Sequence, residues 1–270
     1  MQHDLAVAAI QLNACHGRQD NVAGAIALVE QAAAGGAKLI VLPELFNGYG
    51  DLSQVVREAE PIPGPTSEAM RDLAQRLGVW LLAGSIGEQS SQPDRAYNTS
   101  LLFDPQGRLA ARYRKMHLFN VDVPGRLRVC ESEHMLGGDE VVTLDTKLGT
   151  LGIGICYDLR FPELFRRMST LGLEVLLFPS AFTRPTGRHH WEVLLRARAI
   201  ENQCYIVAAN QCGQHSESLA SYGHSLIVDP WGRILAEAGE EETIIAANLS
   251  AITLQETRDR LTVLKNRRLT

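Results

Sequence analysis

The sequence is poor in cysteine, and the few cysteines present are not arranged for disulfide bonds. Five occur in 270 residues, none of them in a C-x-x-C pair: Cys15, Cys130, Cys156, Cys204 and Cys212. An odd number without paired spacing argues against a disulfide framework and favours a reducing compartment, so we expect a cytoplasmic protein. The histidines show no recognisable ligand spacing either, so we expect no metal site.

Long apolar runs and an excess of positive charge are also absent. No run approaches the roughly 20 residues that a membrane-spanning helix needs, and the N-terminus, MQHDLAVAAIQLN, lacks the basic region of a secretory signal. The formal net charge is -5, and no basic stripe offsets it. We therefore expect neither a membrane nor a nucleic acid as a partner.

The sequence does contain short apolar runs that alternate with segments of helical pattern. The runs have the length of buried strands and cover residues 5–12, 37–42, 79–85, 151–156, 174–178 and 204–209. Helices are expected between them, including one that begins at Pro162 and one over residues 190–203. This alternation predicts an α/β fold in which helices cover the outer face of a sheet.

The second half of the chain repeats the first. The segment SLLFDPQGRLA at 100–110 returns as SLIVDPWGRIL at 225–235, and the strand before each segment keeps the same offset of 125 residues. Both segments suit two strands joined by a type I turn, with Pro second and Gly fourth in the turn. Two such halves predict a four-layer αββα sandwich. Two separate domains would need a linker, and the one long interruption, 121–138, lacks linker composition.

Three predicted strands end at residues that could perform chemistry: Glu44, Lys115 and Cys156. The carboxyl ends of strands carry the sites of α/β sheets. Cys156 also stands where a strand gives way to a helix start, whose N–H groups would favour a thiolate. Each residue alone has a structural interpretation, as a core cysteine or a solvated charge. Together they supply the nucleophile, the proton carrier and the oxyanion-stabilising cation of acyl transfer.

The motifs around these residues resemble those of the carbon–nitrogen hydrolase, or nitrilase, superfamily: VLPELF at 41–46, YRKMHLF at 113–119 and GICYDLRFPE at 154–163. The resemblance extends over essentially the whole chain. It implies a single domain over residues 1–270 with the four-layer αββα sandwich, assembly into a homodimer or a higher homo-oligomer, and no cofactor. Glu131, in the segment CES, matches the family's second glutamate, which helps to position the substrate and the lysine.

The resemblance also implies hydrolysis of a small carboxylated amide to an acid and ammonia through a cysteine thioester. Glu44 would take the proton from Cys156, whose thiolate would attack the amide carbonyl. Lys115 and the backbone N–H of Tyr157 would stabilise the oxyanion. Glu44 would then protonate the departing ammonia and activate the water that hydrolyses the thioester.

Within the superfamily, the chain is most similar to deaminated glutathione amidases, through residues 196–217 and 221–225. It is next most similar to omega-amidases, through residues 117–126. We favour deaminated glutathione as the substrate, with 2-oxoglutaramate or another amide as alternatives. The candidate substrate contacts are Arg184, Arg188, Thr186 and Phe182. A guanidinium can hold a carboxylate bidentately, whereas the alternative interpretation is a solvated basic loop.

Two other classes of function stay open. A thiol redox protein could use Cys156, but no resolving cysteine lies near it in the sequence. A catalytically inactive scaffold is disfavoured because all the functional positions hold the residues that the chemistry needs. Arg160 is expected to form an ion pair with Glu163 at the helix start, and otherwise to contact the substrate.

Overall fold

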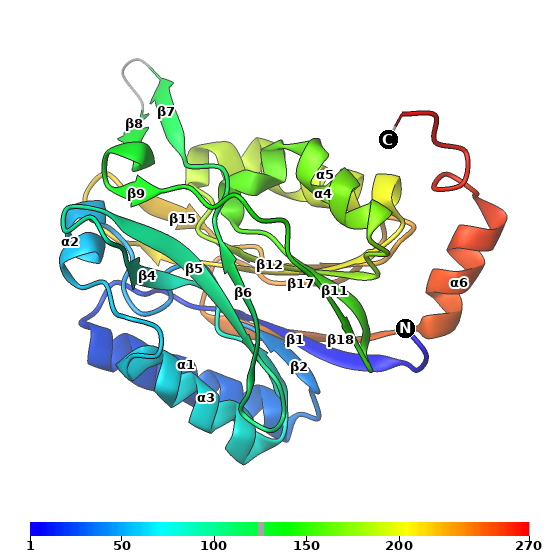
Figure 1. Cartoon of the computed structure of the whole chain (residues 1–270), viewed down its shortest axis with the longest axis horizontal. Coiled ribbons are helices and arrows are strands. Elements are labelled where there is room, and N and C mark those ends of the chain that lie inside the picture. Colours follow the sequence, from blue (N-terminus) through cyan, green and yellow to red (C-terminus); the bar gives the residue numbers. More distant parts are fainter. Residues whose placement is uncertain (124–126, 270) are drawn as a thin grey trace.

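The computed structural model describes residues 1–123 and 127–269, and two β-sheets dominate it (Figure 1). The strands of the first sheet follow the order β18 (Thr243–Leu249), β1 (Leu5–Gln11), β2 (Leu39–Val41), β3 (Trp80–Leu82), β5 (Ala96–Phe103) and β4 (Ile86–Gln89), and β6 (Leu109–Arg114) and β9 (Met135–Leu136) also pair with β5. The strands of the second follow the order β10 (Thr143–Thr146), β11 (Gly149–Ile153), β12 (Val175–Ser180), β13 (Tyr205–Asn210), β16 (Leu226–Val228) and β17 (Ile234–Glu237).

The two sheets repeat one topology. In the first, β1, β2 and β3 are parallel, and antiparallel strands lie on either side, β18 next to β1 and β5 next to β3. In the second, β11, β12 and β13 are parallel, and β10 and β16 flank them in the same way. The β5–β6 and β16–β17 hairpins occupy corresponding places. The predicted repeat is confirmed.

Helices cover the outer face of each sheet, and the inner faces of the sheets pack on each other (Figure 1). Helices α1 (Arg18–Ala34) and α3 (Pro65–Leu77) lie on the first sheet, and α4 (Pro162–Thr170) and α5 (Arg184–Asn202) lie on the second. The short α2 (Leu52–Arg57) lies against β4, and α6 (Ala251–Arg260) follows β18 at one end of the molecule. This is the predicted four-layer αββα sandwich.

The central parallel strands carry continuous apolar runs because both of their faces are covered. On β1, Leu5, Val7 and Ala9 belong to the apolar cluster that the two sheets share. Ala8 and Ile10 point the other way, into the cluster with α1 and α3. Successive side chains of a strand point to opposite faces, so a strand between two apolar layers needs a continuous apolar run.

One helix begins earlier than predicted. We expected a helix over residues 190–203, whereas α5 begins at Arg184. Pro185 occupies its first turn, where a missing N–H costs nothing, and this signal marks the true start. Arg184 and Arg188 therefore lie on a helix rather than on a loop.

Shorter elements complete the chain. They are the β7–β8 hairpin (Asn120–Val123 and Leu127–Cys130), the β14–β15 hairpin (Cys212–Gln214 and Ala220–Tyr222), and two 3₁₀ helices (Glu131–Glu133 and Cys156–Arg160). Residues 124–126 end the segment that resembles omega-amidases, and they lie outside the described residues.

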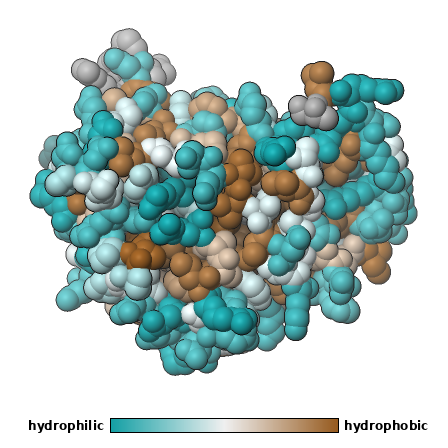
Figure 2. All heavy atoms as spheres, in the orientation of Figure 1, coloured by the Kyte–Doolittle hydropathy of each residue, from teal (hydrophilic) through white to brown (hydrophobic). Residues whose placement is uncertain are grey.

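Across residues 1–123 and 127–269, no helix is both long enough and apolar enough to cross a membrane. On the face seen in Figure 2, hydrophobic residues form small groups among hydrophilic ones. In that same part of the chain, no three His, Cys, Asp or Glu side chains gather as a metal ion would require.

Candidate active site

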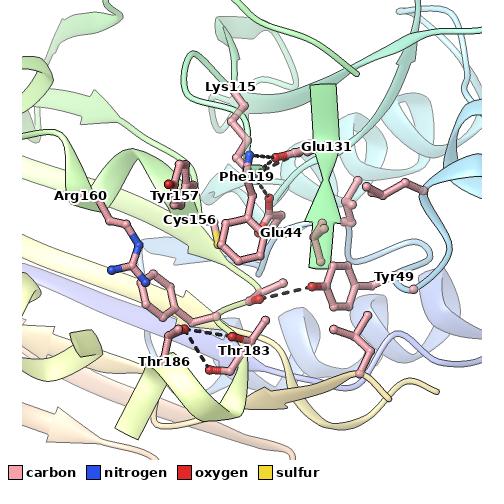
Figure 3. A pocket seen from close by; sticks show the side chains of 17 residues that line it. Glu44, Tyr49, Lys115, Phe119, Glu131, Cys156, Tyr157, Arg160, Thr183 and Thr186 are labelled. Carbon is pink, nitrogen blue, oxygen red and sulfur yellow. Dashed lines mark hydrogen bonds and ion pairs between the residues drawn. The ribbon is translucent and has the colours of Figure 1, made fainter. Parts of the chain in front are cut away.

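The loops after β2, β6 and β11 meet at one small cavity of about 80 Å³ (Figure 3). Glu44 follows β2, Lys115 follows β6 and Cys156 follows β11, so each comes from the end of a different strand. Their exposed fractions are 3%, 2% and 9%, respectively. Glu131, in the 3₁₀ helix after β8, lines the same cavity. The structure thus brings together the four residues that the sequence singled out.

Lys115 lies between two buried carboxylates. Its Nζ is 2.9 Å from Glu44 Oε1 and 2.9 Å from Glu131 Oε2. Burial alone would lower the pKa of Lys115, but the charges of Glu131 and Glu44 raise it well above its usual value. Lys115 is therefore a cation at neutral pH, and two ion pairs fix its position (Figure 3).

Hydrogen bonds hold Glu44 in place from several directions. Its Oε1 accepts from Asn98 Nδ2 at 2.8 Å as well as from Lys115. Its backbone oxygen accepts from Gln211 Nε2 at 2.9 Å. Both side-chain bonds end on Oε1, so Oε2 is the oxygen of Glu44 that can accept a proton. Sequence reasoning missed Asn98, because it lies on β5 with no chemical motif around it.

Cys156 occupies an unusual backbone conformation. Its φ angle is 47°, in the left-handed region that residues other than glycine rarely adopt. Such conformations are concentrated at functional sites, where the surrounding structure maintains them. Here the conformation forms the sharp turn between β11 and the 3₁₀ helix Cys156–Arg160, and it places the sulfur beside Glu44 and Lys115 (Figure 3).

The resting thiol is not the thiolate that we expected from a helix start. Burial raises the pKa of Cys156 well above its usual value, and the Glu44 carboxylate raises it further, while Lys115 acts in the opposite direction. The helix that follows Cys156 has only five residues, so its dipole is small. Cys156 is therefore protonated at neutral pH, and a base must remove its proton before it can attack.

Arg160 lines the opposite part of the cavity from Lys115 (Figure 3). The expected ion pair with Glu163 is not formed. Instead, Arg160 Nη1 lies 3.1 Å from His190 Nδ1, and its guanidinium lies 5.2 Å from the centre of the Phe182 ring. Among the described residues that line the cavity, the cations are Lys115 and Arg160, and only Lys115 is paired with a carboxylate.

The four predicted substrate contacts divide into two pairs. Phe182 and Thr186 line the cavity, and Thr186 Oγ1 lies 2.9 Å from Thr183 Oγ1. Arg184 and Arg188 line a separate depression, and Arg184 lies 3.6 Å from Glu240. Arg184 and Arg188 lie on the first turns of α5 and do not line the cavity, so the structure does not bring them to the site as the candidate substrate contacts would require.

A larger depression of about 540 Å³ adjoins the cavity. The two share Tyr49, Gly50, Val129 and Leu219 in their walls. Tyr49, which sequence reasoning missed, donates a hydrogen bond to the backbone oxygen of Ala181 at 3.4 Å. A molecule bound beside Cys156 could therefore extend past Tyr49 into this depression.

Residues 6–259 match the carbon-nitrogen hydrolase family. Omega-amidase NIT2 of Xenopus tropicalis is 40% identical over 251 residues, which cover 93% of this chain and 90% of that protein. Human deaminated glutathione amidase is 41% identical over 267 residues, which cover 97% of this chain and 82% of that protein.

Solved structures have the same fold. The Caenorhabditis elegans NitFhit protein superposes with a TM-score of 0.91 at 38% identity, and the match covers 98% of this chain but 65% of that longer one. A glutamate-to-glutamine mutant of an amidase of Nesterenkonia sp. AN1 superposes with a TM-score of 0.80 at 26% identity, covering 96% of this chain and 98% of that one. Its structure shows acrylamide added to the active-site cysteine.

Proposed function

This chain belongs to the carbon–nitrogen hydrolase family and is an amidase, and we propose that it hydrolyses deaminated glutathione through a thioester on Cys156. The observation that carries the proposal is the convergence of Glu44, Lys115 and Cys156 in one buried cavity. The adduct on the active-site cysteine of the Nesterenkonia amidase supports the choice of nucleophile.

The first step is proton transfer from Cys156 to Glu44. Burial and Glu44 raise the pKa of the thiol, so a free thiolate is unfavourable. The transfer therefore needs a base within the cavity, and a carbonyl already in place for the thiolate to attack. The transfer moves one negative charge from Glu44 to the sulfur and leaves the net charge of the site unchanged. The thiolate then attacks the amide carbon.

Lys115 and the backbone N–H of Tyr157 stabilise the oxyanion that forms. Tyr157 is the second residue of its short helix, where an N–H has no partner within the helix. Protonated Glu44 gives its proton to the leaving nitrogen, the C–N bond breaks, and the acyl group stays on the sulfur. Glu44 then takes a proton from water, whose oxygen attacks the thioester carbon. The C–S bond breaks, the acid leaves, and Glu44 returns the proton to the Cys156 thiolate, which restores the starting state.

Arg160 is the residue that would bind a carboxylate of the substrate. It is half-buried in the cavity wall and paired with a histidine rather than an acid, so its charge is available to a ligand. Thr186 can add a hydroxyl donor, and Phe182 supplies an apolar surface beside it. Arg160 thus takes the role that we expected of Arg184 and Arg188.

The two best candidate substrates share one acyl group. In both deaminated glutathione and 2-oxoglutaramate, the scissile carbonyl belongs to a 2-oxoglutaryl group with a free carboxylate at its other end. They differ in the leaving group, which is cysteinylglycine in the first and ammonia in the second. The expected release of ammonia therefore applies only to the second. The depression beyond Tyr49 offers space for a dipeptide, and this favours deaminated glutathione.

An activity assay with trapping tests both parts of the proposal. We expect a higher kcat/KM for deaminated glutathione than for 2-oxoglutaramate, and a trapped 2-oxoglutaryl adduct on Cys156 by peptide mass spectrometry. An adduct on Cys204 or Cys212 would disprove the choice of nucleophile. A higher kcat/KM for 2-oxoglutaramate would instead assign omega-amidase activity, which the similarity to the Xenopus enzyme also supports.

A further inference from the structure

The mechanism depends on the spacing between Lys115 and Cys156, which belong to different sheets. Lys115 follows β6 of the first sheet, and Cys156 follows β11 of the second. A cation stabilises a developing oxyanion only when it lies within hydrogen-bond distance of it. Some contact must therefore hold the two loops in register.

Asp158 makes that contact. It is fully buried, with an exposed fraction of 0%, and its two carboxylate oxygens accept four hydrogen bonds. Three come from the residues that flank Lys115. Tyr113 Oη donates to Oδ2 at 2.7 Å, and the backbone N and Nδ1 of His117 donate to Oδ1 at 3.0 and 2.7 Å. The fourth comes from the backbone N of Ile155, the residue before Cys156, which donates to Oδ2 at 2.8 Å.

A further packing contact reinforces this connection. The His117 ring stacks on Phe161, with ring centres 3.8 Å apart and planes within 7°. Phe161 directly follows the 3₁₀ helix that carries Cys156 and Asp158. The loop of Lys115 is thus held to the loop of Cys156 in two places, within that helix at Asp158 and just beyond it at Phe161.

We propose that Asp158 is a positioning residue, whose carboxylate holds the Lys115 loop against the Cys156 loop and so sets the distance from ammonium to thiol. The proposal rests on the proposed roles of Lys115 and Cys156. Asp158 lies two residues beyond Cys156 and acts through both loops.

The pattern of donors explains why a carboxylate is needed. Each oxygen of Asp158 accepts from one backbone N–H, Oδ1 from His117 and Oδ2 from Ile155. A backbone N–H cannot reverse its role as a donor. An asparagine has the same shape but presents an NH₂ group on one side, so it would oppose an N–H in either orientation.

Asp158→Asn is therefore the decisive variant. We expect kcat to fall about 100-fold, because a displacement near 1 Å between reacting groups has that effect, while KM changes less than about threefold. Tyr113→Phe removes one side-chain donor and keeps both backbone donors. Its kcat should fall between threefold and tenfold, by roughly one weak hydrogen bond.

The control is a buried aspartate with a structural role elsewhere. Asp229 is 3% exposed, and its Oδ1 accepts from the backbone N–H groups of Trp231 and Arg233 in the β16–β17 turn. Asp229→Ala should lower the unfolding temperature and leave kcat per folded molecule unchanged. If a substitution only lowers stability, kcat per folded molecule stays unchanged. A fall in this quantity in Asp158→Asn but not in Asp229→Ala therefore reports on positioning.

The reactivity of the thiol provides a second measurement. Cys15 is exposed and serves as an internal reference. In Asp158→Asn, alkylation of Cys156 by iodoacetamide, relative to Cys15 in the same molecules, should slow about tenfold because Lys115 stabilises the thiolate less well. Unchanged relative alkylation, an unchanged kcat, or a rise in KM equal to the fall in kcat would overturn the proposal. If Asp158→Asn does not fold, the same criteria apply to Tyr113→Phe.

The failure of this proposal differs from the failure of the proposed function. If Cys156→Ala remains active, the assigned nucleophile is wrong. If Cys156→Ala is inactive while Asp158→Asn retains full kcat, the mechanism stands and only the positioning role of Asp158 is refuted.

Discussion

The strands β2 and β12 hold equivalent places in the two sheets, and the pattern Pro-x-x-Phe stands at the carboxyl end of each. The first half reads PELF at 43–46, and the second reads PSAF at 179–182. Glu44 and Ser180 therefore correspond, and the two chain segments meet, since the backbone N of Glu44 donates to the backbone oxygen of Ser180 at 3.4 Å. One position holds the proposed base, and its counterpart holds a neutral residue.

The two hairpins, β5–β6 and β16–β17, have matching turns but lead to different residues. The turn residues Asp104 and Asp229 each accept two backbone N–H groups on Oδ1, and the glycines that follow have φ angles of 74° and 84°. Beyond the turns, however, the first hairpin leads to buried Lys115. At the same offset, the second leads to Glu240, whose side chain is 55% exposed.

The two halves thus have the same backbone topology and differ in where charged side chains are buried. A buried lysine is tolerated only beside opposite charges. Glu131, one of the two carboxylates beside Lys115, lies in the interruption at 121–138, which has no counterpart in the second half. The repeat builds the scaffold, and departures from the repeat build the site.

Separate substitutions of the corresponding residues Glu44 and Ser180 should give the largest difference in kcat. Glu44→Gln should lower kcat by about 10³-fold or more, because the proposed base acts in both half-reactions. Ser180→Ala should stay within about twofold of the original kcat, since the buried Ser180 hydroxyl makes no hydrogen bond to any described residue. Steady-state kinetics on the preferred amide measures both, and equal losses would show that the site uses the two halves alike.

Removing the charge of Lys115 should have the next largest effect. Lys115→Met should lower kcat about 10²- to 10³-fold by loss of an oxyanion partner. It should also destabilise the protein by about 3 kcal/mol, because Glu44 and Glu131 would face each other unpaired. Glu240→Gln, its exposed counterpart, should change neither kcat nor the urea midpoint. A large effect of Glu240→Gln would mean that the second hairpin also serves the site.

The two arginines Arg160 and Arg184 allow a smaller contrast within the second half. Arg160→Ala should raise KM for a carboxylated amide about 30-fold, the value of one charge-assisted hydrogen-bonded pair, and leave a neutral amide nearly unaffected. Arg184→Ala should leave both KM values unchanged, because its guanidinium faces Glu240 outside the cavity. A charge-selective rise in KM for Arg184→Ala would restore the expectation from the sequence.

The β5–β6 and β16–β17 turns should lose similar amounts of stability when their aspartates are removed. Asp104→Ala and Asp229→Ala should each lower the free energy of unfolding by about 2 kcal/mol, since each leaves two backbone N–H groups without their acceptor. Urea unfolding at pH 7 measures both values. A difference greater than about 1 kcal/mol would show that the hairpins are not energetically equivalent, because larger gaps exceed the usual error of such comparisons.

The smallest effect concerns pH. Burial raises the pKa of Asp104, but hydrogen bonds and the charge of Arg108 outweigh it and lower the pKa below its usual value. A lowered folded-state pKa stabilises the protein above the unfolded-state pKa of about 3.9 and is lost as pH falls through the folded-state value. The stability difference between Asp104→Ala and the original protein should therefore shrink between pH 5 and pH 2. A constant difference across that range would contradict the assignment.

Much of this protein could be read from local patterns in its sequence. Apolar runs of strand length, the 125-residue offset and the three motifs predicted the sandwich and brought Glu44, Lys115 and Cys156 to strand ends. These features depend on residues close together in the chain, or on repetition, and both are visible without coordinates.

The tertiary structure decided what depends on distance between remote segments. Arg160, at the end of the 3₁₀ helix that begins at Cys156, lines the cavity. Arg184 lies at the start of α5, outside the cavity and 3.6 Å from Glu240. The thiol of Cys156 is held neutral by burial and by Glu44, more than 100 residues away, and not activated by its own short helix. The four bonds of Asp158 likewise join two loops from different sheets. Charge and hydrogen bonding act through space, so only the folded chain determines which of the candidate residues meet.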